Sequence, residues 1–151
     1  MMLLNKALKF LKAKTIFQRM DASMSTWKFA KDSALTAEQF VAELEKIEKE
    51  EAIPFVVLDV REDFEIEIAD LPKKINDEVE LPKRNIPLRT LLEGKYDESV
   101  FPKDKSIVCL CHHGVRSAYA ANYLAKKGIH GLNLLGGIDA LSDFMEEIPR
   151  Y

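Results

Sequence analysis

The sequence predicts a single α/β domain in which a mainly parallel sheet is covered by helices. Two apolar runs, at residues 53–60 and 106–110, have the length and composition of strands that are buried on both faces. The second run continues through a short polar loop into an Ala-rich helix, and a last short strand is expected at residues 131–135. The length of 151 residues suits one domain with its own core.

Composition excludes several classes of protein. The net charge of −3 gives no indication of nucleic-acid binding, and no apolar run is long enough to cross a bilayer. The two cysteines, Cys109 and Cys111, are two positions apart on one predicted strand, where they cannot easily bridge each other. So few thiols in a chain of this size indicate a reducing compartment rather than a disulfide scaffold.

The first 32 residues differ from the rest of the chain. Residues 1–20 contain five basic residues and no acidic residue, and their leucines recur at helical spacing. This pattern is similar to a transit peptide for the matrix of a mitochondrion or another organelle. The alternatives are a solvated basic extension, or a start at Met20 or Met24, with a cytoplasmic protein. We therefore expect an extension over residues 1–32 and the folded domain over residues 33–151.

The first part of the domain carries strand and helix signals. The alternation at 26–30 favours an edge strand. Thr36 and Gln39 then form the pattern of a capping box, with Leu35 and Phe40 at the spacing of a hydrophobic staple, so a helix is expected to follow. Its charged residues are interpreted as a water-facing surface.

The strand predicted at 53–60 ends in polar residues whose role has two interpretations. Ligand sites of open α/β sheets lie beyond the carboxyl ends of the strands, which would place Arg61 on the same rim as Cys111. Alternatively, Asp59 and Arg61 form a buried pair that holds neighbouring loops. For Asp59 the structural role is preferred, because a carboxylate disfavours a nearby thiolate. For Arg61 both roles remain open.

The later elements are read from turn signals. Residues 73–84 are polar and predict an exposed inserted loop, which is either a plain surface insertion or a partner contact. A short helix is expected over 88–92, stopped by Gly94. After the strand at 131–135, Gly136 and Gly137 allow a sharp turn into a helix that carries apolar residues as far as Met145.

The loop after the strand at 106–110 has the chemistry of a nucleophile site. Cys111 stands where that strand ends, and Ser117 is a candidate N-cap for the next helix. Backbone amides and the positive end of a helix stabilise a thiolate, which is the reactive form of cysteine. Gly114 suits a loop that curls around its own centre. Cys109, flanked by apolar residues, is expected to lie in the core.

Four segments resemble one family. Residues 111–117 read Cys-His-His-Gly-Val-Arg-Ser and are similar to the active loop of rhodanese-type sulfurtransferases. Residues 58–62 resemble the family's Asp-Val-Arg signature, residues 135–141 its Gly-Gly turn, and residues 148–151 the ending of the rhodanese domain fused to molybdopterin-synthase sulfurylase-type proteins. The usual Gly-His turn after Asp-Val-Arg is absent. The resemblance implies a three-layer rhodanese-like fold with a five-stranded, mainly parallel sheet and helices on both faces.

The resemblance also implies an activity. It makes Cys111 the catalytic nucleophile, which takes a sulfane sulfur from thiosulfate or a persulfide and passes it to a thiophilic acceptor. Four residues separate Cys111 from Arg116, whereas cysteine phosphatases have five, so the loop suits one terminal sulfur better than a phosphate. The residues expected to bind substrate are His112, His113, Gly114, Val115, Arg116, Ser117 and Arg61.

Neither an organic cofactor nor a metal is implied, since ligands packed as densely as Cys109, Cys111, His112 and His113 cannot easily surround an ion. The main alternative function is a relay between proteins, in which a cysteine desulfurase supplies persulfide sulfur and a ubiquitin-like carrier receives it. A non-catalytic interaction domain is disfavoured, because both Cys111 and Arg116 are present. Otherwise the expected partner is a small anionic sulfur donor, with no nucleic acid and no membrane.

Overall fold

A computed structural model describes residues 27–151. The predictions of a transit peptide and of later start sites fall outside these residues. Five parallel strands form the main sheet in the order β1-β7-β6-β2-β5. Their bounds are β1 (Ala34–Leu35), β2 (Phe55–Asp59), β5 (Lys83–Asn85), β6 (Ser106–Leu110) and β7 (Gly131–Leu134). The α/β class and the parallel sheet predicted from the apolar runs are confirmed.

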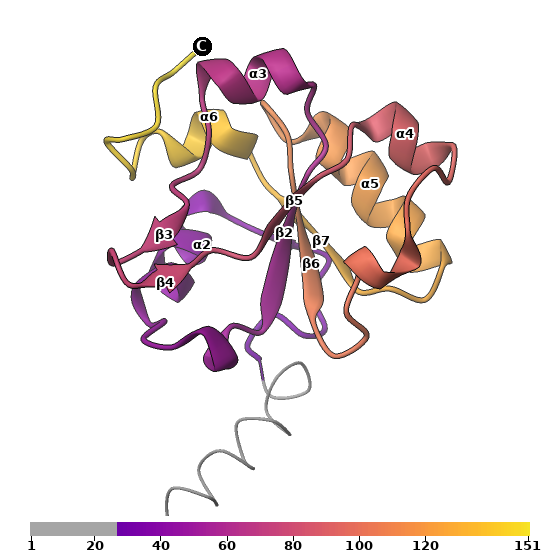
Figure 1. The fold of residues 1–151 in the computed structure, drawn as a ribbon, viewed down its shortest axis with the longest axis horizontal. Helices are drawn as coiled ribbons and strands as arrows, with labels where there is room; N and C mark the ends of the chain where they lie inside the picture. Colours follow the sequence, from indigo (N-terminus) through magenta and orange to yellow (C-terminus); the bar gives the residue numbers. More distant parts are fainter. Residues whose placement is uncertain (1–26) are drawn as a thin grey trace, which may run out of the picture.

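Helices cover both faces of this sheet and complete three layers. The helices are α2 (Ala37–Glu45), α3 (Asp63–Ile68), α4 (Leu88–Leu92), α5 (Val115–Lys126) and α6 (Gly137–Leu141). In Figure 1, β2, β6 and β7 lie at the centre of the fold, with α2 and α6 on one side and α4 and α5 on the other. Alternate residues of β2 belong to different core clusters: Phe55 and Val57 share one with residues of α2 and α6, and Val56 and Leu58 share the other with α4 and α5. Such alternation explains why a strand buried on both faces has no polar side.

The sheet brings together the ends of the two strands that carry the predicted motifs. β2 lies between β5 and β6, and Asp59 is in register with Leu110. The Val60 amide donates to the Leu110 carbonyl at 2.9 Å. Cys111 therefore follows β6 at the edge where β2 also ends.

Two predicted helices have the expected termini. At the start of α2, Thr36 accepts from the Gln39 amide at 3.1 Å and the Gln39 side chain accepts from the Thr36 amide at 2.8 Å, which is a complete capping box. α4 ends before Gly94, which has a φ of 71°. Within residues 27–151, no helix combines the length and apolar character that a membrane span needs.

The edge strand predicted at 26–30 is wrong. Residues 27–31 form turns, in which the Ala30 amide donates to the Trp27 carbonyl at 3.0 Å. Trp27 and Phe29 are nevertheless buried, and the Trp27 ring lies 5.6 Å from that of Phe55. A turn can bury alternate side chains as a strand does, so alternation over five residues did not distinguish the two.

Residues 73–84, predicted as an exposed loop, are largely exposed, but they form strands and a tight turn rather than a loop. The first part of the segment is an antiparallel hairpin of β3 (Lys74–Ile75) and β4 (Val79–Glu80), and the second part enters β5. Asn76 and Asp77 have positive φ at the turn, as Asn and Asp tolerate. The apolar residues Ile75, Val79 and Leu81 are buried in the core, and they anchor the segment among its charged neighbours.

The last helix is shorter than predicted. α6 ends at Leu141, and residues 142–144 form a turn rather than continuing the helix to Met145. Phe144, expected on the apolar side of the helix, is about half exposed. α6 nevertheless begins at the predicted glycine pair.

Candidate active site

Cys111 lies between the end of β6 and the start of α5. Gly114, with a φ of 95°, is the residue before the helix, and α5 begins at Val115. Ser117 is therefore not the predicted N-cap but the third residue of the helix, and its side chain faces the sulfur. The left-handed conformation that glycine accepts makes the turn from strand to helix within three residues.

Within the part of the chain that the structure describes, the sulfur of Cys111 has two polar contacts. The Gly114 amide donates to Sγ at 3.0 Å, and the Ser117 hydroxyl lies 3.2 Å from Sγ. Gly114 directly precedes α5, so its amide lies at the positive end of the helix. A negative charge on sulfur is favoured there. The direct contacts of the sulfur are thus with one amide and one hydroxyl, whereas the sequence predicted several amides.

Asn133 completes a closed set of hydrogen bonds around this sulfur. Its amide nitrogen donates to the Gly114 carbonyl at 3.0 Å, so its oxygen must face Ser117, whose hydroxyl donates to it at 2.6 Å. Because Ser117 has one hydroxyl proton, its oxygen can then only accept from the Cys111 thiol. When Cys111 ionises, the Ser117 hydroxyl can donate to the thiolate only by rotating away from Asn133.

The start of α6 holds the other side of the loop. The amides of Ile138 and Asp139 donate to the carbonyls of Cys111 and His112 at 2.9 and 3.1 Å. A Cβ on Gly137, which has a φ of 62°, would collide with both carbonyls. The glycine pair predicted to turn the chain therefore also allows the close approach of α6 to the loop.

Both cysteines are buried, but their surroundings differ. Cys109 is completely buried among apolar residues, and this burial raises the pKa of its thiol. It lies in the core, as predicted. Cys111 is 1% exposed, although its sulfur touches the polar loop. The residue is therefore almost closed off from solvent in this structure.

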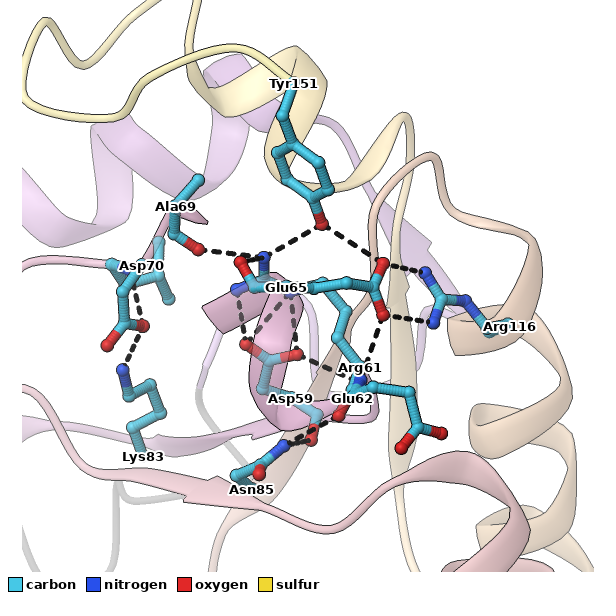
Figure 2. Close-up of polar contacts among 11 residues, drawn as sticks. Asp59, Arg61, Glu62, Glu65, Ala69, Asp70, Lys83, Asn85, Arg116 and Tyr151 are labelled. Atoms are coloured by element: carbon cyan, nitrogen blue, oxygen red, sulfur yellow. Dashed lines mark hydrogen bonds and ion pairs between the residues drawn. The ribbon is translucent and has the colours of Figure 1, made fainter. Parts of the chain in front are cut away.

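Arg116 points toward α3 and pairs with Glu65. Its two terminal nitrogens each lie 2.7 Å from a different Glu65 carboxylate oxygen, a bidentate arrangement (Figure 2). The hydrogen bonds from Arg116 lower the pKa of Glu65 to about 2, and those from Glu65 raise the pKa of Arg116. The guanidinium is thus fixed next to the loop by an ion pair.

Arg61 does not line the loop, so the structure does not support its predicted substrate-binding role. Its side chain is 0% exposed, and its guanidinium forms a salt bridge of 2.7 Å with the equally buried Asp59. It also donates to the Ala69 carbonyl at 2.8 Å and to the Tyr151 hydroxyl at 3.0 Å (Figure 2). Asp59 and Arg61 form the buried structural pair that was the alternative interpretation.

The His112 ring is stacked between the rings of His113 and Tyr151. The His112 ring lies 3.7 Å from His113 and 3.8 Å from Tyr151, and its Nε2 lies 2.6 Å from the main-chain oxygen of Tyr151. His112, His113 and Asp139 each bring one possible ligand atom within 4.8 Å of the others. Stacked imidazoles direct their lone pairs along nearly parallel planes, so this arrangement does not converge on a metal ion.

The other predicted substrate-binding residues differ in how exposed they are. His113 and Val115 are exposed, while Ser117 is buried beside the sulfur. Glu65, Asn133 and Tyr151 were not singled out as site residues. A signal existed for Asn133, the one polar side chain in the short strand β7, whereas Glu65 was hidden among the acidic residues of α3.

The low pKa of Glu65 predicts a specific pH dependence. A carboxyl whose pKa falls from 4.5 to about 2 on folding stabilises the protein above pH 4.5 and loses this contribution as the pH falls toward 2. We expect Glu65→Gln to lower the free energy of unfolding at pH 7, and the difference from wild type to shrink between pH 4.5 and 2.5. Denaturant unfolding across this range measures it. Glu67→Gln, at an exposed position of α3, is the control, and a difference independent of pH would contradict the assignment.

Comparison with known sequences identifies a family and a relative. The model of the rhodanese-like domain family matches residues 36–143. A sulfurtransferase of Allochromatium vinosum is 36% identical over 86 residues, which are 56% of this chain and 69% of that protein.

Solved structures share the fold. A rhodanese-like domain protein from Staphylococcus aureus superposes with a TM-score of 0.59 at 24% identity, over 79% of this chain and 98% of that one. A Rhodopseudomonas palustris protein of unknown function, described as a possible tyrosine phosphatase, gives a TM-score of 0.60 at 23% identity, over 90% and 93%. The Cys111 loop at the end of β6, the sheet that carries it and the match of the family over residues 36–143 show that this chain belongs to the rhodanese-like family and has a sulfurtransferase-type function.

Proposed function

We propose that the protein moves a sulfane sulfur from thiosulfate or a persulfide donor to a thiophilic acceptor through a persulfide on Cys111. The observation that carries the proposal is the contact of Sγ with the Gly114 amide at the start of α5, with the Ser117 hydroxyl on its other side. These donors stabilise the attacking thiolate and can serve a second sulfur bound to it.

The reaction has two balanced steps. In the first, the Cys111 thiolate attacks the outer sulfur of the donor. A sulfur–sulfur bond forms on Cys111 and the donor's own bond to that sulfur breaks, so that sulfite leaves thiosulfate, or a thiolate leaves a persulfide, with the bonding electrons. In the second, cyanide or an acceptor thiolate attacks the same outer sulfur and Cys111 leaves as thiolate. No external oxidant or reductant is consumed.

Arg116 contributes positive charge next to the loop, but in a moderated form. Glu65 accepts one N–H from each of its terminal nitrogens and balances its charge, so the Nε–H and the second N–H of each terminal nitrogen are left for a ligand. About a third of the Arg116 side chain is exposed. Because its charge is balanced by Glu65, Arg116 can orient a bound sulfur donor but attracts the thiosulfate dianion from solution only weakly. This favours a persulfide over thiosulfate as the sulfur donor.

A second candidate, relay of sulfur between proteins, is favoured by exposed apolar residues beside the site. Phe64 and Ile68 of α3 and Val115 and Tyr119 of α5 are about half exposed or more, and the Glu65–Arg116 pair joins these two helices. Large exposed apolar side chains near a site are typical of a protein-binding surface. The partners would be a cysteine desulfurase as donor and a ubiquitin-like carrier as acceptor.

Two assays on the wild-type protein separate these functions. Thiocyanate release from thiosulfate and cyanide at a substantial rate supports transfer between small molecules. Silence with thiosulfate, together with transfer of sulfur to Cys111 from a cysteine desulfurase, supports the relay. Hydrolysis of ordinary phosphoesters, with neither of these reactions, would contradict both and would show that the loop accepts a phosphoryl group.

A further inference from the structure

Tyr151 contacts the Glu65 that pairs with Arg116 and also the loop residue His112. Its hydroxyl accepts from Arg61 Nη1 at 3.0 Å and donates to Glu65 Oε1 at 3.2 Å (Figure 2). The same Glu65 oxygen accepts from Arg116 at 2.7 Å. A continuous set of polar contacts therefore runs from the buried Asp59–Arg61 pair, through Tyr151 and Glu65, to the guanidinium beside the loop.

Tyr151 also holds His112. The two rings are stacked at 3.8 Å with an interplanar angle of 5°, and His112 Nε2 lies 2.6 Å from the main-chain oxygen of Tyr151. The main-chain oxygen of Tyr151 can only accept, so His112 Nε2 is the donor in this contact. This contact fixes both the position of the ring and the nitrogen that bears its hydrogen. His112 directly follows Cys111, and Arg116 is the last basic residue of the loop.

We propose that Tyr151 is a positioning residue for the donor half of the reaction, which fixes Arg116 through Glu65 and fixes His112 by stacking. This inference rests on the proposed sulfur transfer. Burial raises the pKa of Tyr151, so its hydroxyl keeps the proton that it donates to Glu65.

The contacts of Arg61 show why loss of the hydroxyl has a local effect. Without it, Arg61 still pairs with Asp59 and still donates to the carbonyls of Ala69 and Glu65. Glu65 Oε1, in contrast, loses its link to the buried pair and is held by Arg116 alone. The Glu65–Arg116 pair thus loses one of its two supports and keeps the other, the Glu62 amide that donates to Glu65 Oε2 at 2.9 Å, while the strand end beneath it stays in place.

Kinetics of three variants test the proposal. Tyr151→Phe removes the hydroxyl and keeps the ring, whereas Tyr151→Leu removes both. Tyr123→Phe is the matched control, because it removes a hydroxyl that is hydrogen-bonded to the hydroxyl of Tyr96. We expect Tyr151→Phe to lower kcat/KM for the donor about tenfold, with kcat/KM for the acceptor almost unchanged. Tyr151→Leu should lower the donor value further. The control should match wild type in both half-reactions.

A second measurement does not depend on sulfur transfer. The terminal nitrogens of Arg116 should give separate NMR signals in wild type and in Tyr123→Phe, because the pair with Glu65 restrains rotation of the guanidinium. These signals should merge in Tyr151→Phe. If wild type transfers no sulfur, the proposed function fails, yet merged signals would still support the positioning role.

Three results would contradict the role proposed for Tyr151. Wild-type kinetics together with separate Arg116 signals in Tyr151→Phe would overturn the proposal. Equal and parallel losses in both half-reactions, with a lower melting temperature, would show a merely structural role. If kcat/KM for the donor were the same in Tyr151→Phe and Tyr151→Leu, stacking of Tyr151 on His112 would have no role in the reaction.

Discussion

Cys111→Ser is expected to lower the rate of sulfur transfer by at least about 10³-fold. Serine fits the space of cysteine and can keep hydrogen bonds with Gly114 and Ser117, but its hydroxyl forms no persulfide and is a far weaker nucleophile than a thiolate. Folding should be preserved, so that the loss is chemical. The measurement is the rate of sulfur transfer with the donor that the wild-type protein uses.

Cys109→Ala is the matched control for this experiment. Cys109 is two positions earlier on β6, completely buried and part of the core that α4 and α5 cover. Its replacement leaves a small cavity and should lower stability with little change in activity. If Cys111→Ser kept substantial activity while Cys109→Ala lost it, the nucleophile would be the other cysteine and the site would have to be assigned again.

Arg61→Met is expected to lower the free energy of unfolding by about 3–5 kcal/mol. Methionine fills most of the volume of the arginine stem, but it leaves the Asp59 carboxylate buried without its partner. The carbonyl of Ala69 also loses its donor. Denaturant unfolding measures the effect, and Arg89→Met, at an exposed position of α4, should change the free energy by less than about 1 kcal/mol.

The Arg61 variant also decides between the two roles that the sequence left open. A double variant with Asp59→Asn should recover part of the lost stability, because it removes the uncompensated charge. An Arg61→Met protein of wild-type stability, with a raised KM for an anionic donor, would instead show that Arg61 binds substrate.

The features that could be predicted from the sequence are those set by local chemistry. The apolar runs predicted β2 and β6 because a strand buried on both faces has no polar side. The Cys111 loop was recognisable because strand, polar loop and helix follow each other directly in the chain. The capping box of Thr36 and Gln39 was likewise contained in four consecutive residues.

The features that could not be predicted depend on contacts between distant segments. Glu65 meets Arg116 across 51 positions, and Tyr151 meets Arg61 across 90. Nothing in the local pattern distinguishes Glu65 from the exposed acids around it. Arg61 shows the opposite error: the expectation that strand ends face a ligand placed it at the rim, whereas Asp59, Ala69 and Tyr151 use its donors inside the protein.

The central claim is that the sulfur in transit is bound to Cys111, and mass spectrometry of the protein after incubation with a sulfur donor tests it most directly. The account predicts that the peptide containing Cys109 and Cys111 gains the mass of one sulfur atom, that fragment ions assign it to Cys111, and that an acceptor removes it. A donor that is consumed while Cys111 gains no sulfur, or sulfur found on Cys109 instead, would contradict the account.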